Sequence, residues 1–425
     1  MAYYLKEKQT SQDEKENNLD IPTIVRNALE DIKKRGREAA IELSIKFDNW
    51  NPNDFRISQD EILNAKKLLS QTFIEDVKYC QKQVRTFAEK QLESLHEVEF
   101  EIQPGITLGH RLVPISNVGA YIPGGRYPII ASAQMSIIPP KVAGSDRVIA
   151  CTPPQKGEGI HPGVLYALNE AGADEIYALG GIQAIGSMAY GIEGLSSVDF
   201  LVGPGNAFVA EAKRQVFGEV GIDQIAGPSE ILVLADDTAD PELVAADLWG
   251  QSEHDFNAIP ILIAFSEDFA NKVLKEMEKQ LPHLKTAEVA KAAWEKNGEV
   301  VIIKSIEEAI EVTESYAIEH LEIHASNLDY YLKNLKNYGS LFLGEETTVA
   351  YGDKGIGTNH ILPTGRAARY TGGLWVGKFI KTITYQKATK EASRKLAPII
   401  SRQSLAEGMH AHSITADIRS NKFKS

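Results

Sequence analysis

A repeated succession of short apolar strand, Gly- or Pro-rich turn and helix begins near residue 119 and constrains the fold more than any other feature. Residues 148–151 and 175–179 are apolar stretches of strand length, and each is followed by such a turn. Residues 198–202 form a third stretch, which ends in Gly-Pro-Gly before a helical run over 207–216. Strands that alternate with helices in this way predict a parallel sheet with helices on its faces.

A second series of apolar strands with helices between them follows in the rest of the chain. Its strands are predicted at 231–235, 259–265, 300–304, 321–325 and 340–343. At 425 residues the chain is too long for one compact core. The pattern therefore predicts an α/β protein with two parallel-sheet domains of similar build, although no sequence repeat is strong enough to prove duplication.

The two ends of the chain differ from this pattern. Residues up to Asn18 are polar and charged, and a helix start follows, with Asp20 as the cap and Pro22 in the first turn. A longer amphipathic helical stretch covers roughly 58–93. Beyond Lys378 we expect helix to the end of the chain, in a tail too small for an independent domain. We expect this tail to dock on another surface.

Charge and cysteine content exclude several classes of protein. The net charge of −13 argues against nucleic-acid binding, which needs a concentrated basic surface. Cys80 and Cys151 cannot supply a disulfide framework or a thiolate zinc site. The first residues lack the apolar core of a signal peptide, and the apolar run at 259–265 is too short to cross a bilayer. We therefore expect a soluble protein of the cytoplasm.

Gln251 and His254 are the first candidates for metal ligands. They follow a helix that Asp240 can cap and Pro241 can begin, and a spacing of three residues places both on one helical face. A metal ion could bind the amide oxygen and the imidazole nitrogen together. Taken alone, the pair is more typical of ordinary polar residues than of a metal site.

Glu319 and His320 are adjacent, between a predicted amphipathic helix at 306–316 and the strand at 321–325. An acid and an imidazole in a loop between helix and strand can serve as paired proton-transfer groups. Within a strand, neighbouring side chains would point to opposite faces and could not cooperate. We therefore expect these two residues in the loop.

The segment 351–360 combines three glycines with an acid, Asp353, and an imidazole, His360, and we expect a loop with unusual backbone angles. The tail adds His410, for which we favour a solvated surface, and His412. The candidate metal ligands are Gln251, His254, Asp353 and His412. These nitrogen and oxygen donors suit zinc, with manganese or cobalt as alternatives.

Nucleotide binding is not indicated by a standard fingerprint, because no Gly-x-Gly-x-x-Gly follows a strand. Glycine-rich turns instead occur at 121–125, 180–183 and 203–206. The latter two lie where a strand meets a helix, and N–H groups at a helix start favour phosphate. Tight strand-to-helix connections explain each of these turns equally well.

Read together, these pieces resemble the histidinol dehydrogenase family from about residue 20 to 419. The resemblance rests on nine segments in the same order: YIPGGRYP, PPKVAG, GGIQAI, GPGNAFVAEAKRQVFGEVGID, AGPSEILVLAD, QSEH, IEHLE, GTNHILPTG and EGMHAH. It implies two incomplete Rossmann-like domains, with small N-terminal and C-terminal helical elements exchanged in a homodimer. It also implies NAD and one zinc ion per subunit as cofactors.

On this basis we divide the chain into four parts. They are an N-terminal arm (1–20), a first α/β domain with the metal and catalytic residues (21–120 plus 231–377), a second, NAD-binding α/β domain (121–230) and a C-terminal helical tail that docks on the partner subunit (378–425).

The resemblance implies a role for each candidate residue. His320 would act as the base, and Glu319 would help to activate water. The zinc ligands would be Gln251, His254, Asp353 and His412. NAD would contact Tyr121, Gln183 and Asn206. The substrate would contact Ser229, His360 and Glu407, together with His320 and the metal-binding residues. Glu407 and His412 would complete the active site of the other subunit, so the two active sites would be shared.

The implied reaction is NAD-dependent oxidation of a primary alcohol of a small polar substrate, through two hydride transfers to the carboxylate. The segments 338–354 and 367–386 resemble a divergent branch of the family that includes sulfopropanediol dehydrogenases. Gly250 before Gln251 and Lys354 after Asp353 also depart from the usual biosynthetic sequence. Two substrates stay open: 2,3-dihydroxypropane-1-sulfonate, oxidised to sulfolactate, and L-histidinol, oxidised to L-histidine.

A sulfonate would need cationic donors, and the candidates are Arg126, Lys354, Arg366 and Arg369. Contacts with NAD phosphates or surface acids would explain these bases equally well. Two other classes of function compete with a dehydrogenase. A zinc hydrolase would use Glu319 and His320 as its general base and need no NAD. A non-catalytic binding module is disfavoured because the full set of candidate groups is present.

Overall fold

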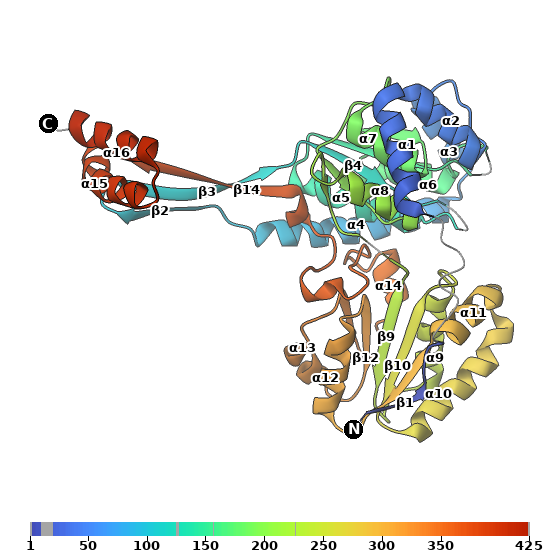
Figure 1. The fold of residues 1–425 in the computed structure, drawn as a ribbon. Coiled ribbons are helices and arrows are strands. Elements are labelled where there is room, and N and C mark those ends of the chain that lie inside the picture. The colour runs from blue at the N-terminus through green and yellow to red at the C-terminus, as the bar shows by residue number, and fades with distance from the viewer. Residues whose placement is uncertain (1, 10–19, 125–126, 156, 226, 424–425) are drawn as a thin grey trace.

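The computed structural model describes residues 2–9, 20–124, 127–155, 157–225 and 227–423, and Figure 1 shows two sheet-containing bodies and a long arm. The first body contains a five-stranded, wholly parallel sheet in the order β6-β5-β4-β7-β8. Its strands are β4 (Asn117–Tyr121), β5 (Arg147–Thr152), β6 (Glu175–Ala178), β7 (Phe200–Val202) and β8 (Gly221–Ile222). Helices α5 (Ile130–Ala143), α6 (Pro162–Ala171), α7 (Gly181–Tyr190) and α8 (Ala207–Val216) connect them.

The second body contains a six-stranded sheet in the order β1-β11-β10-β9-β12-β13. Its strands are β9 (Glu230–Ala235), β10 (Ile259–Ala264), β11 (Glu299–Ile302), β12 (His320–His324) and β13 (Ser340–Leu343), all parallel, with β1 (Tyr3–Lys6) antiparallel to β11. Its helices are α9 (Pro241–Ser252), α10 (Glu267–Gln280), η1 (Leu281–His283), α11 (Ala287–Asn297), α12 (Ile306–Tyr316), α13 (Leu328–Asn334) and α14 (Val349–Lys354).

The two sheets share one topology. When the parallel strands of each sheet are numbered from the first, β4 to β8 and β9 to β13 both follow the order 3-2-1-4-5. This is the order of a Rossmann fold without its sixth strand. The predicted fold class, two incomplete Rossmann-like parallel-sheet domains, is confirmed. Exchange of the terminal elements between subunits stays a prediction.

The N-terminal helices pack on the helices that flank the five-stranded sheet. They are α1 (Ile21–Arg35), α2 (Arg37–Asp48), α3 (Gln59–Lys67) and α4 (Gln71–Glu93), and Asp20 caps α1 as expected. α1 contacts α7 and α8, and α4 contacts α5. Val25 and Leu29 lie in one buried cluster with Tyr177. The predicted division groups residues 21–120 with the sheet that begins at residue 231, whereas α1 to α4 contact helices of the first body. These contacts depend on packing between segments that are distant in the sequence.

A three-stranded antiparallel sheet forms the long arm in Figure 1. It pairs β14 (Ile380–Ala388) with β3 (Ile106–Pro114) and β3 with β2 (Val98–Gln103). Helices α15 (Lys390–Ala406) and α16 (His410–Lys422) pack together at its far end. We expected helix throughout 378–425, but the tail begins with a nine-residue strand. The strand is rich in β-branched residues (Ile380, Thr382, Ile383 and Thr384), which favour pairing with β3.

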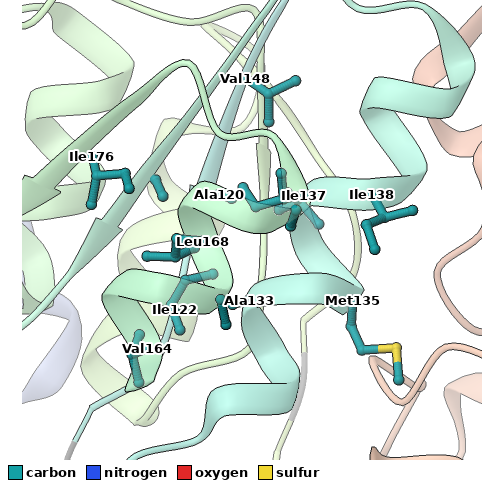
Figure 2. Packing of buried hydrophobic residues seen from close by; sticks show 14 of the residues in the cluster. Ala120, Ile122, Ala133, Met135, Ile137, Ile138, Val148, Val164, Leu168 and Ile176 are labelled. Atoms are coloured by element: carbon teal, nitrogen blue, oxygen red, sulfur yellow. The ribbon is translucent and has the colours of Figure 1, made fainter. Parts of the chain in front are cut away.

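The main core of the first body lies between its sheet and the helices α5 and α6. Figure 2 shows apolar side chains from these helices and from β4 to β6 gathered in one cluster. α5 is buried along almost its whole length. Two short 3-10 helices, η2 (Ala367–Arg369) and η3 (Val376–Phe379), lie between α14 and the arm along the chain, and η3 packs against α5. No helix in the described part of the chain has the length and apolar character needed to cross a membrane.

Candidate active site

Glu319 and His320 lie at the amino end of β12, where the second body faces the first. The chain leaves α12 through Ala317 in a left-handed conformation (φ 47°). His320 is the first residue of the strand, which begins one residue earlier than predicted, and Glu319 lies in the bend before it. Glu319 Oε2 is 3.3 Å from His320 Nδ1, so the two side chains meet as a proton-transfer pair requires.

The surroundings of the His320 ring fix which nitrogen carries the proton. Nδ1 lies 2.9 Å from the carbonyl oxygen of Glu230 and beside the Glu319 carboxylate, and both of these accept hydrogen bonds. Nδ1 is therefore the donor, and in a neutral ring Nε2 is free to accept a proton. Nε2 is buried without a hydrogen-bond partner among the described residues, 3.6 Å from Asp353 Oδ1.

The charges around His320 act on its pKa. Burial by itself lowers the pKa of the ring, but the carboxylates of Glu319 and Asp353 raise it well above its ordinary value. Glu319 Oε2 also accepts a hydrogen bond of 2.8 Å from the backbone N–H of Glu230. The main chain at Glu230 therefore holds both members of the pair.

Three of the four predicted metal ligands meet around His320. Gln251 lies in the last turn of α9 with its amide nitrogen 3.4 Å from His320 Nδ1. Asp353 lies in the last turn of α14, and its Oδ2 is 3.7 Å from His254 Nε2. Gln251 and Asp353 are buried, whereas 35% of the His254 side chain is exposed. This open side leaves room for a further ligand or a substrate.

The protonation states of these residues fit a zinc site. Burial tends to raise the pKa of Asp353, but the neighbouring His320 outweighs it and holds that pKa below its ordinary value. Loss of hydration lowers the pKa of His254. An ionised carboxylate, a neutral imidazole and an amide are donors that zinc accepts.

Two local expectations differ from the structure. α9 ends at Ser252, so His254 lies just beyond the helix and not on its face, and its backbone N–H donates to the Gln251 carbonyl at 3.3 Å. The predicted loop at 351–360 begins as helix, because α14 extends to Lys354 with Thr348 as its cap. Tertiary contacts stabilise this short helix despite its glycine.

The first body holds the segment that follows Asp353. Ser132 of α5 lies 3.0 Å from His360 Nε2, while His360 Nδ1 lies 2.9 Å from the Asp353 carbonyl. Gln134 of α5 donates to the Lys354 carbonyl at 2.7 Å. These bonds join the five-stranded body to the loop that carries Asp353 and His360.

The remaining candidates for substrate binding surround this centre. Ser229 precedes Glu230 and is partly exposed. Gly365, the residue before Arg366, donates its N–H to Glu230 Oε1 at 3.0 Å. Arg366 and Arg369 are exposed beside this contact, and Lys354 is exposed next to Asp353. Arg126 lies outside the described residues.

Glu407 and His412 lie at the far end of the arm, away from the other candidates of the same chain (Figure 1). Glu407 ends α15, and His412 lies in the first turn of α16. Both are exposed. Within one chain the arm therefore does not bring His412 to Gln251, His254 and Asp353.

The three predicted NAD contacts lie at the carboxyl edge of the five-stranded sheet. Tyr121 ends β4, and its hydroxyl oxygen accepts the Gly181 N–H at 3.2 Å. Gln183 in α7 donates to Asp48 at 2.8 Å. Asn206 caps α8 and accepts N–H bonds from the first turn. This edge, next to the point where the strand order reverses, is where such sheets bind ligands.

Glu230 is one of three site residues that sequence reasoning missed. It is 8% exposed at the start of β9. Burial and the nearby Glu319 raise its pKa to about 7, against the opposing bond from Gly365. Its position in the motif AGPSE, at the head of an apolar strand, was the available signal. Ser132 and Gln134 were missed as well, because only tertiary contacts bring α5 to the site.

The fold and site together define a class: an α/β oxidoreductase with a dinucleotide-type sheet next to a buried acid–base pair and a metal-type ligand set. The chain matches the histidinol dehydrogenase family over residues 10–420, and it belongs to this family. It is accordingly an NAD-dependent dehydrogenase acting on CH–OH groups.

Similar proteins support this assignment over the full length of the chain. A histidinol dehydrogenase homolog of Shouchella clausii is 48% identical over 423 residues, covering 100% of both chains. The sulfopropanediol 3-dehydrogenase of Ruegeria pomeroyi is 43% identical and covers 98% of this chain and 96% of its own. The crystal structure of histidinol dehydrogenase from Elizabethkingia anophelis superposes with a TM-score of 0.92 at 36% identity, covering 99% and 95% of the two chains.

Proposed function

We propose that the protein oxidises a primary alcohol of a small polar substrate to the carboxylate, with two molecules of NAD and one zinc ion per subunit. One observation carries this proposal. The buried Nε2 of His320 has no hydrogen-bond partner among the described residues and lies beside Asp353, with Gln251 at its other nitrogen. A base aimed at an open metal-type site suits removal of a hydroxyl proton.

In the first oxidation, the neutral form of the His320 ring takes the hydroxyl proton at Nε2 while hydride leaves the same carbon for the nicotinamide. The Glu230 carbonyl and the Glu319 carboxylate hold Nδ1 and stabilise the imidazolium that forms. Tyr121, Gln183 and Asn206 contact the NAD. Gln251, His254 and Asp353 hold zinc, which when bound supplies a Lewis acid that orients the substrate.

In the second oxidation, water adds to the aldehyde with help from Glu319, and His320 removes a proton from the hydrate as hydride leaves. The two steps together consume one alcohol, one water and two NAD cations. They yield one carboxylate, two NADH and three protons. The protein therefore needs no oxidant other than NAD.

We favour 2,3-dihydroxypropane-1-sulfonate as the substrate, because the chain resembles the divergent branch of the family. This substrate would be oxidised to sulfolactate. Lys354, Arg366 and Arg369 offer exposed cationic donors around the site. Guanidinium groups bind oxyanions well. The 43% identity to a sulfopropanediol 3-dehydrogenase supports the same substrate. L-Histidinol, oxidised to L-histidine, is the alternative.

Completion of the site requires a second subunit. We propose a homodimer in which His412 of the partner subunit is the fourth zinc ligand and Glu407 of the partner subunit contacts the substrate. The exposed apolar residues of the arm support this, among them Phe100, Ile399 and Ile414, which are 50%, 49% and 55% exposed. Such surfaces are usually covered by a partner.

The experiment that tests the proposal is NADH formation by the zinc-loaded protein with dihydroxypropanesulfonate and L-histidinol side by side. We expect turnover of the sulfonate and two NADH for each molecule oxidised. Turnover of histidinol alone would replace the favoured substrate. Absence of NADH with both substrates, or hydrolysis without NADH, would contradict the proposal.

A further inference from the structure

A second cluster of ligand-type side chains lies next to the active site, farther along β12 from His320. Alternate residues of a strand share a face, so His320, Glu322 and His324 all point from β12 toward α9 and α14. Asp247 lies one turn before Gln251 on α9. Donor atoms of Asp247, Glu322 and His324 lie within 4.8 Å of one another. The mechanism proposed above uses none of these three residues.

The cluster is buried in an otherwise apolar interface. The side chains of Glu322 and His324 are 0% exposed and that of Asp247 is 12% exposed. Ile231, Val233, Leu248 and other apolar residues form the core around them. Two carboxylates and one imidazole in such surroundings are costly unless a positive charge compensates them.

Several atoms of the cluster have no hydrogen-bond partner among the described residues. These atoms are Oε2 of Glu322 and both ring nitrogens of His324. Nε2 of His324 lies 3.6 Å from Asp247 Oδ2 and 3.6 Å from Glu322 Oε2, beyond hydrogen-bond distance. Nε2 of His324 and the nearer carboxylate oxygens of Asp247 and Glu322 therefore lie across a small gap from one another.

The size of this gap fits a metal ion. Ligand atoms on a tetrahedral ion with bonds of ~2.1 Å lie ~3.4 Å apart, close to the separations in the cluster. The other oxygens are already engaged and fix the carboxylates. Asp247 Oδ1 accepts from the Thr348 hydroxyl at 2.7 Å, and Glu322 Oε1 accepts from the Val349 N–H at 2.7 Å.

We propose that Asp247, Glu322 and His324 form a second divalent-cation site, separate from the zinc site of the reaction. One nitrogen and two carboxylate donors suit zinc, manganese or cobalt. His324, Glu345 and Glu346 line a hollow of about 220 Å³, so further acidic side chains lie next to the site.

The second cation would position the active site and take no part in the chemistry. Glu322 binds the first N–H of α14, and Asp353 lies in the last turn of the same helix. A cation on the free oxygen of Glu322 fixes that carboxylate and, through it, the start of α14. Asp247 and Gln251 connect the two sites along α9.

The test measures metal bound per subunit in the full-length protein after chelation, reloading with zinc and desalting. The variants are His254→Ala for the reaction site, His324→Asn and Asp247→Asn for the second site, and exposed His283→Asn as the control. We expect His324→Asn and Asp247→Asn each to lose about one ion per subunit that His254→Ala retains. Zinc should also raise the thermal unfolding midpoint of His254→Ala. It should not raise the midpoint of the double variant that carries both His254→Ala and His324→Asn.

The results separate this inference from the proposed function. If His324→Asn and Asp247→Asn bind as much zinc as the wild type, a proton shared among the three side chains satisfies the cluster and the inference is wrong. If His324→Asn does not fold, His254→Ala decides. Metal retained by that variant supports the second site, and a metal-free His254→Ala overturns it. If His254→Ala loses metal while His324→Asn and Asp247→Asn do not, the second site is excluded and the proposed reaction site is supported.

Discussion

At the scale of single residues, His320 is the side chain on which the proposed mechanism depends most directly. Asn in its place keeps an N–H donor near the Glu230 carbonyl but provides no base at the position of Nε2. We expect His320→Asn to lower kcat for NADH formation by about 10²- to 10⁴-fold, the usual contribution of a general base. Zinc content should stay that of the wild type, and the exposed His283→Asn should change neither quantity. Wild-type turnover in His320→Asn would remove His320 from the mechanism.

Glu230 gives a second prediction, about pH and stability. Its pKa rises from an ordinary value of 4.5 to about 7 in the folded protein. Between these values the unfolded chain loses the proton while the folded protein keeps it, so the free energy of unfolding falls as pH rises. The difference corresponds to a loss on the order of 3 kcal/mol by neutral pH.

Glu230→Gln should remove that part of the pH dependence while keeping the acceptor for the Gly365 N–H. Urea unfolding at a series of pH values from 4 to 8 measures it, with exposed Glu288→Gln as the control. Equal slopes in the wild type and Glu230→Gln would show that folding does not raise the pKa of Glu230. The sequence could mark the position of Glu230 but not its raised pKa, because Glu319 and Gly365 contribute to its surroundings from distant positions in the chain.

At the scale of elements, the turn after β7 makes a specific demand on Gly203. Its φ is +120°, and a Cβ atom there would collide with the Tyr121 carbonyl oxygen at the end of β4. Gly218 has a similar φ of +107° with nothing within 4 Å of such an atom. We expect Gly218→Ala to cost about 1–2 kcal/mol from backbone strain and Gly203→Ala about 3 kcal/mol or more. Urea unfolding compares the two, and equal losses would contradict the collision.

Elements whose determinants are local were predicted well from sequence. The predicted bounds of α8 and α12 agree with the structure, because capping residues and apolar spacing mark both helices. The segment of α14 was predicted as loop because of its glycine. The sequence does not indicate that the Glu322 carboxylate accepts a hydrogen bond from the first N–H of this helix. β14 was predicted as helix because its partner β3 lies far away in the sequence. Both predictions were wrong because contacts between distant segments stabilise these elements.

At the scale of the whole molecule, the arm raises the question of which chain completes each active site. His412 lies on the arm, while Gln251, His254 and Asp353 lie together in the body of the chain (Figure 1). The proposed homodimer predicts that a damaged body and a damaged tail on different chains complement each other. His254→Ala and His412→Ala should each be inactive as homodimers.

Mixing the two variants under conditions that exchange subunits should restore activity. In a mixed dimer, one site combines the intact body of the His412→Ala chain with the intact tail of the His254→Ala chain, and the other site is doubly damaged. Random exchange makes half of the dimers mixed, so we expect about one quarter of wild-type turnover. A mixture of His254→Ala with Asp353→Ala provides the control, because both lesions lie in the body and no intact site can form. Failure of the first mixture, with exchange shown by mass spectrometry of the intact dimers, would show that His412 does not complete the active site of the partner subunit.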